Sequence, residues 1–197
     1  MMILHCYSEK NWAQQQETWD AVAAIEAAGY TVTDELTITR DDASYWRVLL
    51  RAWGKGRLIH FQQDIVPTVA QIQELINCNY NACTYPHKLI GDNYGLWQGV
   101  WEANPPPTYT KNGVVDFGKA PRPSATIPLQ EPFDEYAEGS GIGLIKLSQA
   151  MQASIPLADY PAPHDWSIMD VWISSYMSQV LQKKWHVHQP NVKHNHY

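Results

Sequence analysis

The sequence predicts an α/β fold, with one domain over residues 1–197 and a mixed, mostly parallel central sheet flanked by helices. Short apolar runs with strand character alternate along the chain with longer segments of helical periodicity, which is typical of a sheet covered by helices. A chain of 197 residues is long enough to build the core of one domain. Its composition, 45% hydrophobic and 17% charged, is that of a globular protein.

Strands are predicted where short apolar runs are bounded by turn-forming residues. These runs cover residues 2–7, 30–33, 58–61, 81–85, 139–147 and 185–189. Helices are predicted where apolar residues recur three and four positions apart. These segments cover residues 14–28, 41–53, 68–78 and about 167–182. Because strands alternate with helices, at least part of the sheet should be parallel.

Residues 91–138 are expected to form a Pro-rich insertion without regular structure. Seven of the 13 prolines fall between residues 91 and 140, and apolar residues show little periodicity there. A long segment of this kind in a compact domain is typically a functional loop, a lid or a disordered excursion.

Composition also bears on the class of function. The formal net charge of −6 argues against a protein that coats nucleic acid, because phosphate contacts need basic patches. Nine Trp and eleven Tyr against three Phe suit sugar or nucleoside sites, although core packing alone could use them. The three cysteines lack metal-type spacing and fit free buried thiols in a reducing cytosol. With neither a signal peptide nor a membrane span evident, a cytoplasmic location is expected.

The most informative stretch is the strand at 58–61 and the polar residues that follow it. Asp64 falls where a buried strand ends and a helix begins, and this edge of an α/β sheet is where ligands bind. A carboxylate preceded by the amides of Gln62 and Gln63 can hold a divalent cation or a sugar hydroxyl. The alternative, that Asp64 caps the following helix, is equally compatible with the spacing.

Histidines are concentrated near the C-terminus. His186 and His188 alternate with apolar residues, so they share one face of a strand, and His194 and His196 repeat that spacing. Paired imidazoles can ligate a metal when a third ligand arrives from elsewhere. Alternatively, His186 and His188 are strand residues that donate to backbone or carboxylate partners, and the last residues are a frayed tail. We favour this second interpretation for His186, and metal binding with Asp64 for the last two histidines.

Six segments, in order, resemble glycosyltransferases of the GT-A fold and, more narrowly, a compact family of glycosyltransferase-like proteins of bacteria and phages. Together they cover most of the chain outside residues 91–138. The segments are residues 51–59, 62–67, 78–86, 141–146, 166–170 and 186–196.

The resemblance implies a Rossmann-like domain that transfers a sugar from a nucleotide-diphosphate sugar. Asp64 would bind Mn²⁺ or Mg²⁺ and through it the donor diphosphate, and His194 or His196 would complete the metal shell. Asp170 would be the general base for the acceptor hydroxyl if the enzyme inverts, with Asp165 in reserve.

Other residues would border the donor. Arg47 and Arg51 lie four apart on the helix at 41–53 and so share a face that could bind phosphate, or they could be plain surface charges. Ser8 and Glu9, after the first strand, would lie beside the nucleoside. The acceptor is open: a polysaccharide, a lipid-linked glycan, a protein or a modified nucleobase.

One departure from the family matters. Its acidic motif usually has two aspartates, and here Gln62 and Gln63 stand where the partner would be. Amides bring no charge, so metal affinity should be weaker. Two alternatives to a transferase therefore remain: a non-catalytic sugar- or nucleotide-binding relative, and a metal-dependent hydrolase built on Asp64 and the C-terminal histidines.

Overall fold

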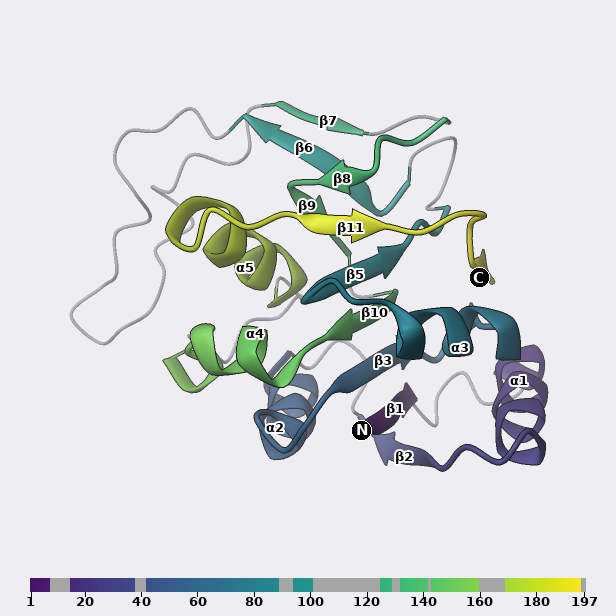
Figure 1. Ribbon diagram of the computed structural model, residues 1–197. Coiled ribbons are helices and arrows are strands. Elements are labelled where there is room, and N and C mark those ends of the chain that lie inside the picture. The colour runs from purple at the N-terminus through teal and green to yellow at the C-terminus, as the bar shows by residue number, and fades with distance from the viewer. Residues whose placement is uncertain are drawn as a thin grey trace.

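The computed structural model describes residues 1–7, 15–37, 42–88, 94–100, 125–128, 132–141, 143–159 and 169–195. A seven-stranded sheet forms its centre (Figure 1). From one edge to the other it contains β2 (Val32–Leu36), β1 (Met2–Tyr7), β3 (Leu58–Gln62), β10 (Leu144–Leu147), β5 (Ala82–Tyr85), β11 (Trp185–Val187) and β8 (Tyr136–Ala137).

The order of these strands makes the sheet mixed. β1 is parallel to both β2 and β3, and β11 is parallel to β5. β10 lies antiparallel between β3 and β5, and β8 is antiparallel to β11. The prediction of a mixed sheet is confirmed. The prediction that the sheet is mostly parallel is not confirmed, because the described strands of this sheet form three parallel and three antiparallel pairings.

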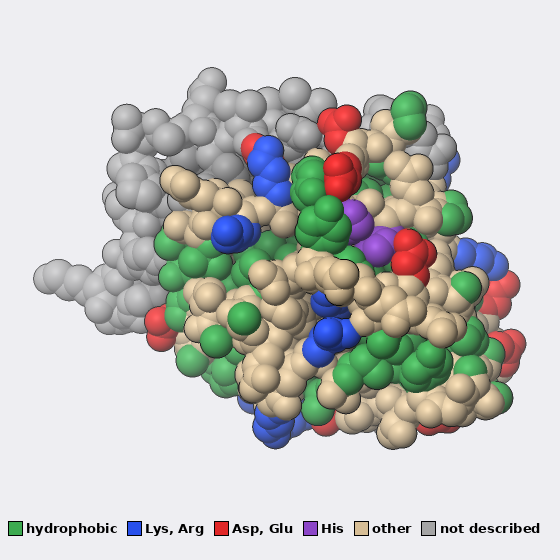
Figure 2. Space-filling model, in the orientation of Figure 1, with side chains coloured by type: hydrophobic (Ala, Val, Ile, Leu, Met, Phe, Trp, Pro, Cys, Tyr) green, Lys and Arg blue, Asp and Glu red, His purple; other side chains and the backbone are tan. Residues whose placement is uncertain are grey.

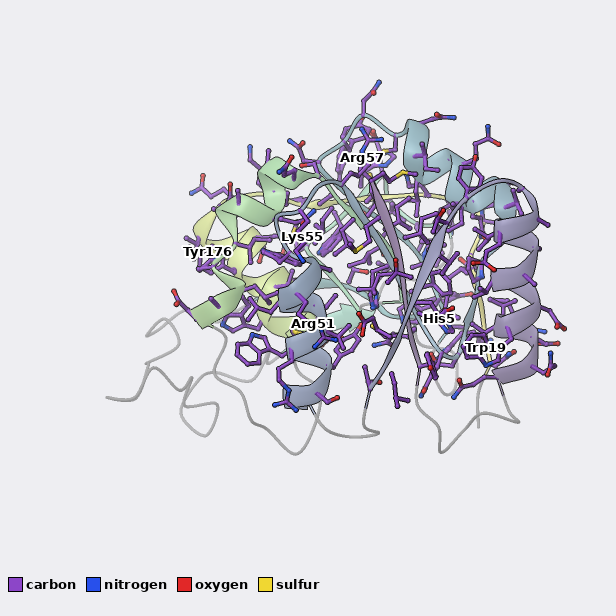
Figure 3. All side chains as sticks on the ribbon, turned by 90° about the horizontal axis from the view of Figure 1, so that it is seen from below. His5, Trp19, Arg51, Lys55, Arg57 and Tyr176 are labelled. Carbon is purple, nitrogen blue, oxygen red and sulfur yellow. The ribbon has the colours of Figure 1, made fainter. Side chains whose placement is uncertain are left out.

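Helices cover both faces of the sheet (Figure 1). The strands alternate their side chains between the two faces, and each face has its own apolar cluster. The helices α1 (Gln16–Ala27) and α3 (Val69–Asn77) contribute to one cluster. The other cluster contains side chains from α2 (Asp42–Ala52), α4 (Gln149–Ser154), α5 (Met169–Ser175) and the 3-10 turn Leu157–Asp159. Helix α5 continues as a π-helical turn (Tyr176–Val180). Figure 3 shows Arg51 on the side of α2, and His5 and Trp19 on the side of α1.

Two smaller sheets complete the fold. β4 (Ile65–Val66) pairs antiparallel with β12 (Lys193–His194), near the C-terminus. β6 (Leu96–Val100) pairs with β7 (Ala125–Pro128) on one side and β9 (Gly139–Ser140) on the other. The expectation that residues 91–138 lack regular structure is therefore wrong in part, because β6, β7 and β8 all fall in that interval.

The single strand predicted at 139–147 is wrong, because β9 and β10 (Leu144–Leu147) are separate strands in different sheets. Most other predicted elements are close to those observed. The first strand has the predicted bounds, and the first three helices differ from prediction by one or two residues at each end. The strand expected at 30–33 is β2, displaced toward the C-terminus. Among the described helices, none is both long and apolar enough to cross a membrane.

Candidate functional site

Asp64 lies in the turn between β3 and β4, at the carboxyl end of a buried strand, as its position in the sequence predicts. The pairing of β4 with β12 sets His194 opposite Ile65 and brings the C-terminal segment against this turn. The Nε2 atom of His194 lies 3.1 Å from Oδ2 of Asp64, and the backbone N–H of Asn195 donates to the Asp64 carbonyl. The predicted partnership between these two side chains is therefore present.

The alternative role for Asp64, capping of α3, is wrong. The residue that caps α3 is Thr68, whose hydroxyl accepts from the backbone N–H of Gln71, while the Gln71 side chain accepts from the backbone N–H of Thr68. This reciprocal arrangement satisfies the first free donors of the helix and needs no other carboxylate. Asp64 is thus available for a different purpose.

The polar atoms of Asp64 and His194 fit a divalent cation. The Oδ1 atom of Asp64 is buried and has no hydrogen-bond partner among the residues that the structure describes. The Nδ1 atom of His194 lies 2.6 Å from the Lys88 carbonyl, to which it can donate, and this directs Nε2 toward the carboxylate. Burial lowers the pKa of His194, but the bond to Asp64, its charge and the Lys88 carbonyl outweigh this, so the net shift is upward. A cation bound to Nε2 of His194 would take the place of the proton on that nitrogen.

His87, which the sequence analysis did not single out, lies beside this pair. It is buried just beyond β5, and its ring centroid is 5.4 Å from that of His194. Gly95, Gly141 and Gly143 surround the ring: a Cβ atom added at Gly95 or Gly143 would lie only 2.3 or 2.4 Å from it. Among the described residues, these glycines make room for His87.

Asp170, in the first turn of α5, reaches the same region. Its Oδ2 atom is 3.6 Å from the position that a Cβ atom of Gly141 would occupy, and the His87 ring is 3.1 Å from that position. Burial raises the pKa of the Tyr45 hydroxyl well above its ordinary value, and the charges of Asp170 and Asp64 raise it further. The charges of both carboxylates therefore act on one buried hydroxyl, although the two residues belong to different elements.

Tyr45 belongs to a buried polar network behind Asp64. Its hydroxyl lies 2.7 Å from Nε2 of His60 and accepts from the Gln62 amide at 3.4 Å. Burial, with a smaller contribution from the charge of His5, lowers the pKa of His60 to about 3, so this imidazole is neutral at pH 7. Helical periodicity alone does not reveal this role of Tyr45, since a hydroxyl pointing inward leaves no trace in periodicity.

The remaining predicted donor-binding residues that the structure describes are Gln63, Arg47 and Arg51. The side chain of Gln63 accepts from the Gln15 amide at 3.1 Å. Arg51 forms an exposed ion pair with Glu35 on β2, at 2.8 Å, and Arg47 is exposed one turn earlier on α2. Their predicted phosphate contacts stay predictions. Ser8, Glu9, Asp165 and His196 lie outside the described residues.

Comparisons with known proteins give little beyond the fold. No protein-family model matches this chain, and no curated protein matches it. Among solved structures, it is similar to the crystal structure of A197 from STIV, with a TM-score of 0.51 and 14% sequence identity. That match covers 96% of this chain and 82% of the other. At this identity the likeness shows a shared fold alone.

Proposed function

We propose that this protein is a glycosyltransferase with a GT-A-like fold that moves a sugar from a nucleotide-diphosphate sugar to an acceptor, with a divalent cation at Asp64. The observation that carries the proposal is that Asp64 and Asp170, from opposite halves of the chain, both lie near His87: Asp64 contacts His194, whose ring centroid is 5.4 Å from that of His87, and Asp170 and His87 both approach Gly141. The resemblance of the sequence to GT-A glycosyltransferases assigns complementary roles to these two carboxylates.

Asp64 and His194 supply the cation-binding end of the site. The unpartnered Oδ1 atom and the Nε2 atom are the oxygen and nitrogen ligands that Mn²⁺ accepts. A single carboxylate is sufficient when substrate phosphates and water provide the other ligands. The bound cation would act as a Lewis acid toward the leaving diphosphate.

Asp170 lies at the other end of the proposed site, where it would act as the general base. Its carboxylate is half-buried beside Gly141, where the chain passes from β9 toward β10. Placed there, it can accept the proton of an acceptor hydroxyl as the new bond forms, a contribution typically worth about 10²–10⁴-fold in rate. His87 is buried beside both ends: its ring centroid lies 5.4 Å from that of His194, and its ring and Asp170 both approach Gly141.

A second candidate is a non-catalytic binding relative. One observation favours it: neither Gln62 nor Gln63 brings a charge, and their side chains bond to Tyr45 and Gln15. Such a protein would bind the nucleotide sugar without breaking it down.

The test is to measure cation-dependent binding and donor breakdown in the same set of variants. Thermal shifts with nucleotide diphosphates and their sugars, with and without Mn²⁺, report binding, because a ligand specific for the folded state stabilises it. Release of the nucleotide diphosphate reports turnover. Asp64→Asn should lose both. Asp170→Asn should keep binding and lose turnover.

Asp159→Asn, at an exposed carboxylate in the 3-10 turn, is the matched control and should retain both. Binding without turnover in the unsubstituted protein would select the binding relative. No thermal shift with any nucleotide would contradict both candidates, and full turnover by Asp64→Asn would show that the site is misassigned.

A further inference from the structure

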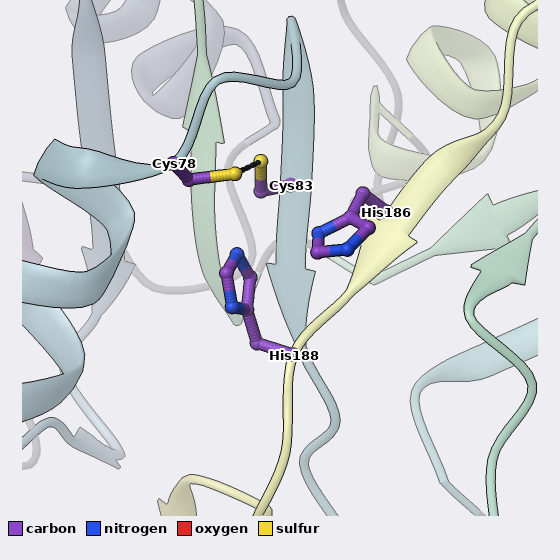
Figure 4. A group of neighbouring side chains, drawn as sticks. All are labelled: Cys78, Cys83, His186 and His188. Carbon is purple, nitrogen blue, oxygen red and sulfur yellow. Dashed lines mark hydrogen bonds between the residues drawn. The ribbon is translucent and has the colours of Figure 1, made fainter.

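Two cysteines and two histidines meet on the face of the sheet that α3 covers. They are Cys78, Cys83, His186 and His188, and their ligand atoms all lie within 4.8 Å of one another. Cys78 is the residue that ends α3, Cys83 is on β5, and the histidines are on β11 and just after it. Figure 4 shows both imidazole rings turned toward the space beside the two sulfur atoms.

Sheet register explains why these residues meet. Cys83 is paired with His186 on one neighbouring strand and with Lys146 on the other, so the three side chains form a row on one face. His188, two positions after His186, returns to that face, and the two ring centroids are 4.7 Å apart. The end of α3 then brings Cys78 over the row. The Cys78 and Cys83 sulfur atoms are 2.8 Å apart and both thiols are free.

The ring nitrogens of His186 and His188 indicate where a ligand could bind. Nδ1 of His188 lies 2.7 Å from Oε1 of Glu74, which leaves Nε2 for another partner. Within the described part of the chain that Nε2 atom is buried without a hydrogen-bond partner, and the same is true of Nδ1 of His186. Buried polar atoms without a partner are rare and costly. A carboxylate bonded to the far nitrogen of an imidazole is also the usual support of a metal-ligating histidine.

We propose that Cys78, Cys83, His186 and His188 bind one Zn²⁺ ion as a structural site. Two sulfur and two nitrogen ligands are the set that Zn²⁺ takes in closed tetrahedral sites, whereas Mn²⁺ and Mg²⁺ prefer oxygen. The site is therefore distinct in ligand chemistry from the one at Asp64. Each thiol loses its proton as its sulfur binds the cation, so that two thiolates balance the two positive charges.

The surroundings suit this assignment. Tyr80 stacks on the His186 ring at 4.0 Å and holds its orientation. Lys146 is 1% exposed, and its Nζ atom lies 3.7 Å from the Cys83 sulfur, while Glu74 provides the opposite charge on the far side. His186 is half-buried, and Figure 2 shows histidine side chains at the surface near β11, between hydrophobic and acidic groups. A cation can therefore enter from solvent.

A disulfide between Cys78 and Cys83 is the competing explanation of the short distance between the sulfur atoms. It would account for the cysteines but not for the histidines, because Nε2 of His188 and Nδ1 of His186 would keep no partner. A zinc ion accounts for all four side chains together.

Zinc at this place would fix the path of the C-terminal segment. His188 begins the segment that reaches β12, and the Gln71 side chain on α3 donates to the Asn191 carbonyl within it. By tying β11 to β5 and to the end of α3, the ion would hold this segment where it carries His194 to Asp64. The zinc proposal does not depend on the proposed glycosyl transfer, since a binding module or a hydrolase would use the same support.

The first experiment is metal analysis of the purified protein, followed by Co²⁺ titration of the protein after zinc removal. We expect one zinc per chain. Tetrahedral Co²⁺ with two thiolates should give intense visible bands and sulfur-to-cobalt charge transfer in the near ultraviolet. Cys78→Ser and His188→Ala should lose stoichiometric zinc, whereas Cys6→Ser, a thiol in the other apolar cluster, and Asp64→Asn should retain it.

Two further measurements keep the proposal falsifiable if a ligand variant fails to fold. Glu74→Ala, which removes a half-exposed partner of His188, should weaken zinc affinity about 10–100-fold. Thiol titration of the denatured protein should find three reactive cysteines. A single reactive thiol would assign Cys78 and Cys83 to a disulfide and overturn the proposal, as would the absence of stoichiometric zinc, a weak octahedral Co²⁺ spectrum, or unchanged affinity in Glu74→Ala.

Discussion

The Nε2 atom of His194 lies 3.1 Å from Oδ2 of Asp64 and joins the C-terminal segment to the turn after β3. Both side chains are largely buried, with 14% and 19% of their surfaces exposed. Since Oδ1 has no partner, His194 provides the one side-chain contact recorded for this carboxylate within the described residues. The pair is thus a structural link, and it supplies the first two ligands of the cation site that we propose.

We expect His194→Ala to lower the free energy of unfolding at pH 7 by roughly 1–3 kcal/mol, because it leaves a buried carboxylate without a partner for either oxygen. Urea denaturation measures this change. Lys193→Ala is the matched control, since the neighbouring Lys193 forms only an exposed ion pair with Glu17 and its loss should matter little. Equal effects of the two substitutions would show that the Asp64–His194 contact contributes nothing specific.

Mn²⁺ should separate the two roles of the pair. In the unsubstituted protein the cation should raise the melting temperature, because it binds the folded state. The shift should shrink in His194→Ala and disappear in Asp64→Asn. A shift of the same size in all three proteins would place the cation elsewhere.

Most of the first half of the fold could be predicted because its signals are local. β1 has the predicted bounds, and Thr68 with Gln71 forms a capping box three residues apart at the start of α3. β2 was placed too early because Asp34 and Glu35 resemble loop residues. In the structure these carboxylates lie in an edge strand, where His5 and Arg51 pair with them.

The sites were harder to predict because they depend on contacts between distant segments. Asp64 could be found from its position at the end of a strand. Cys78 and Cys83, by contrast, have no metal-type spacing by themselves, and His186 was assigned to ordinary strand packing. Only the pairing of β5 with β11 unites them. His87 was missed for a similar reason, since the glycines that surround it come from two separate segments of the chain, at residue 95 and at residues 141–143.

The packing of His87 against glycine can be tested by a double-mutant cycle. In Gly143→Ala the new Cβ atom would lie 2.4 Å from the buried ring, so we expect a loss of about 1–3 kcal/mol in unfolding free energy. In the background of His87→Ala the same substitution should cost much less, because the ring is gone. Additive effects would mean that Gly143 is required for another reason, such as its backbone conformation.

The buried imidazole of His60 should make the protein less stable in acid. Its folded pKa is about 3 and its unfolded pKa is near 6.5, so the unfolded chain binds the extra proton between these values. The favourable contribution of neutral His60 to the free energy of unfolding is complete above about pH 6.5 and is lost as the pH falls toward 3. His60→Gln should therefore flatten the stability profile by about 1.4 kcal/mol per pH unit in this window.

Denaturation at several pH values checks this slope. The carboxylates titrate in both proteins and cancel in the comparison, and His5, whose pKa burial also lowers, leaves a residual slope of the same sign. Parallel profiles for the two proteins would contradict the assignment of a neutral, buried His60.

Lys146 should be needed for stability but not for metal binding. Its Nζ atom donates to the carbonyl of Cys78 at 3.0 Å and to that of Tyr80, so Lys146→Met leaves two acceptors in the loop before β5 without their donor. We expect the free energy of unfolding to fall by roughly 1–3 kcal/mol, measured by urea denaturation. The two unsatisfied carbonyls should cost more than is gained by no longer burying a charge. Lys55→Met, at an exposed lysine, is the control and should change stability little.

Zinc content distinguishes the two ways in which Lys146→Met can act. If the lysine only holds the loop, the variant should still bind one zinc per chain while unfolding more easily, because all four ligands remain. If its positive charge were what keeps the Cys83 sulfur in place, zinc would be lost together with stability. Loss of zinc with no loss of stability would contradict the structural role of Lys146, since the two carbonyls of the loop would then not need its ammonium group.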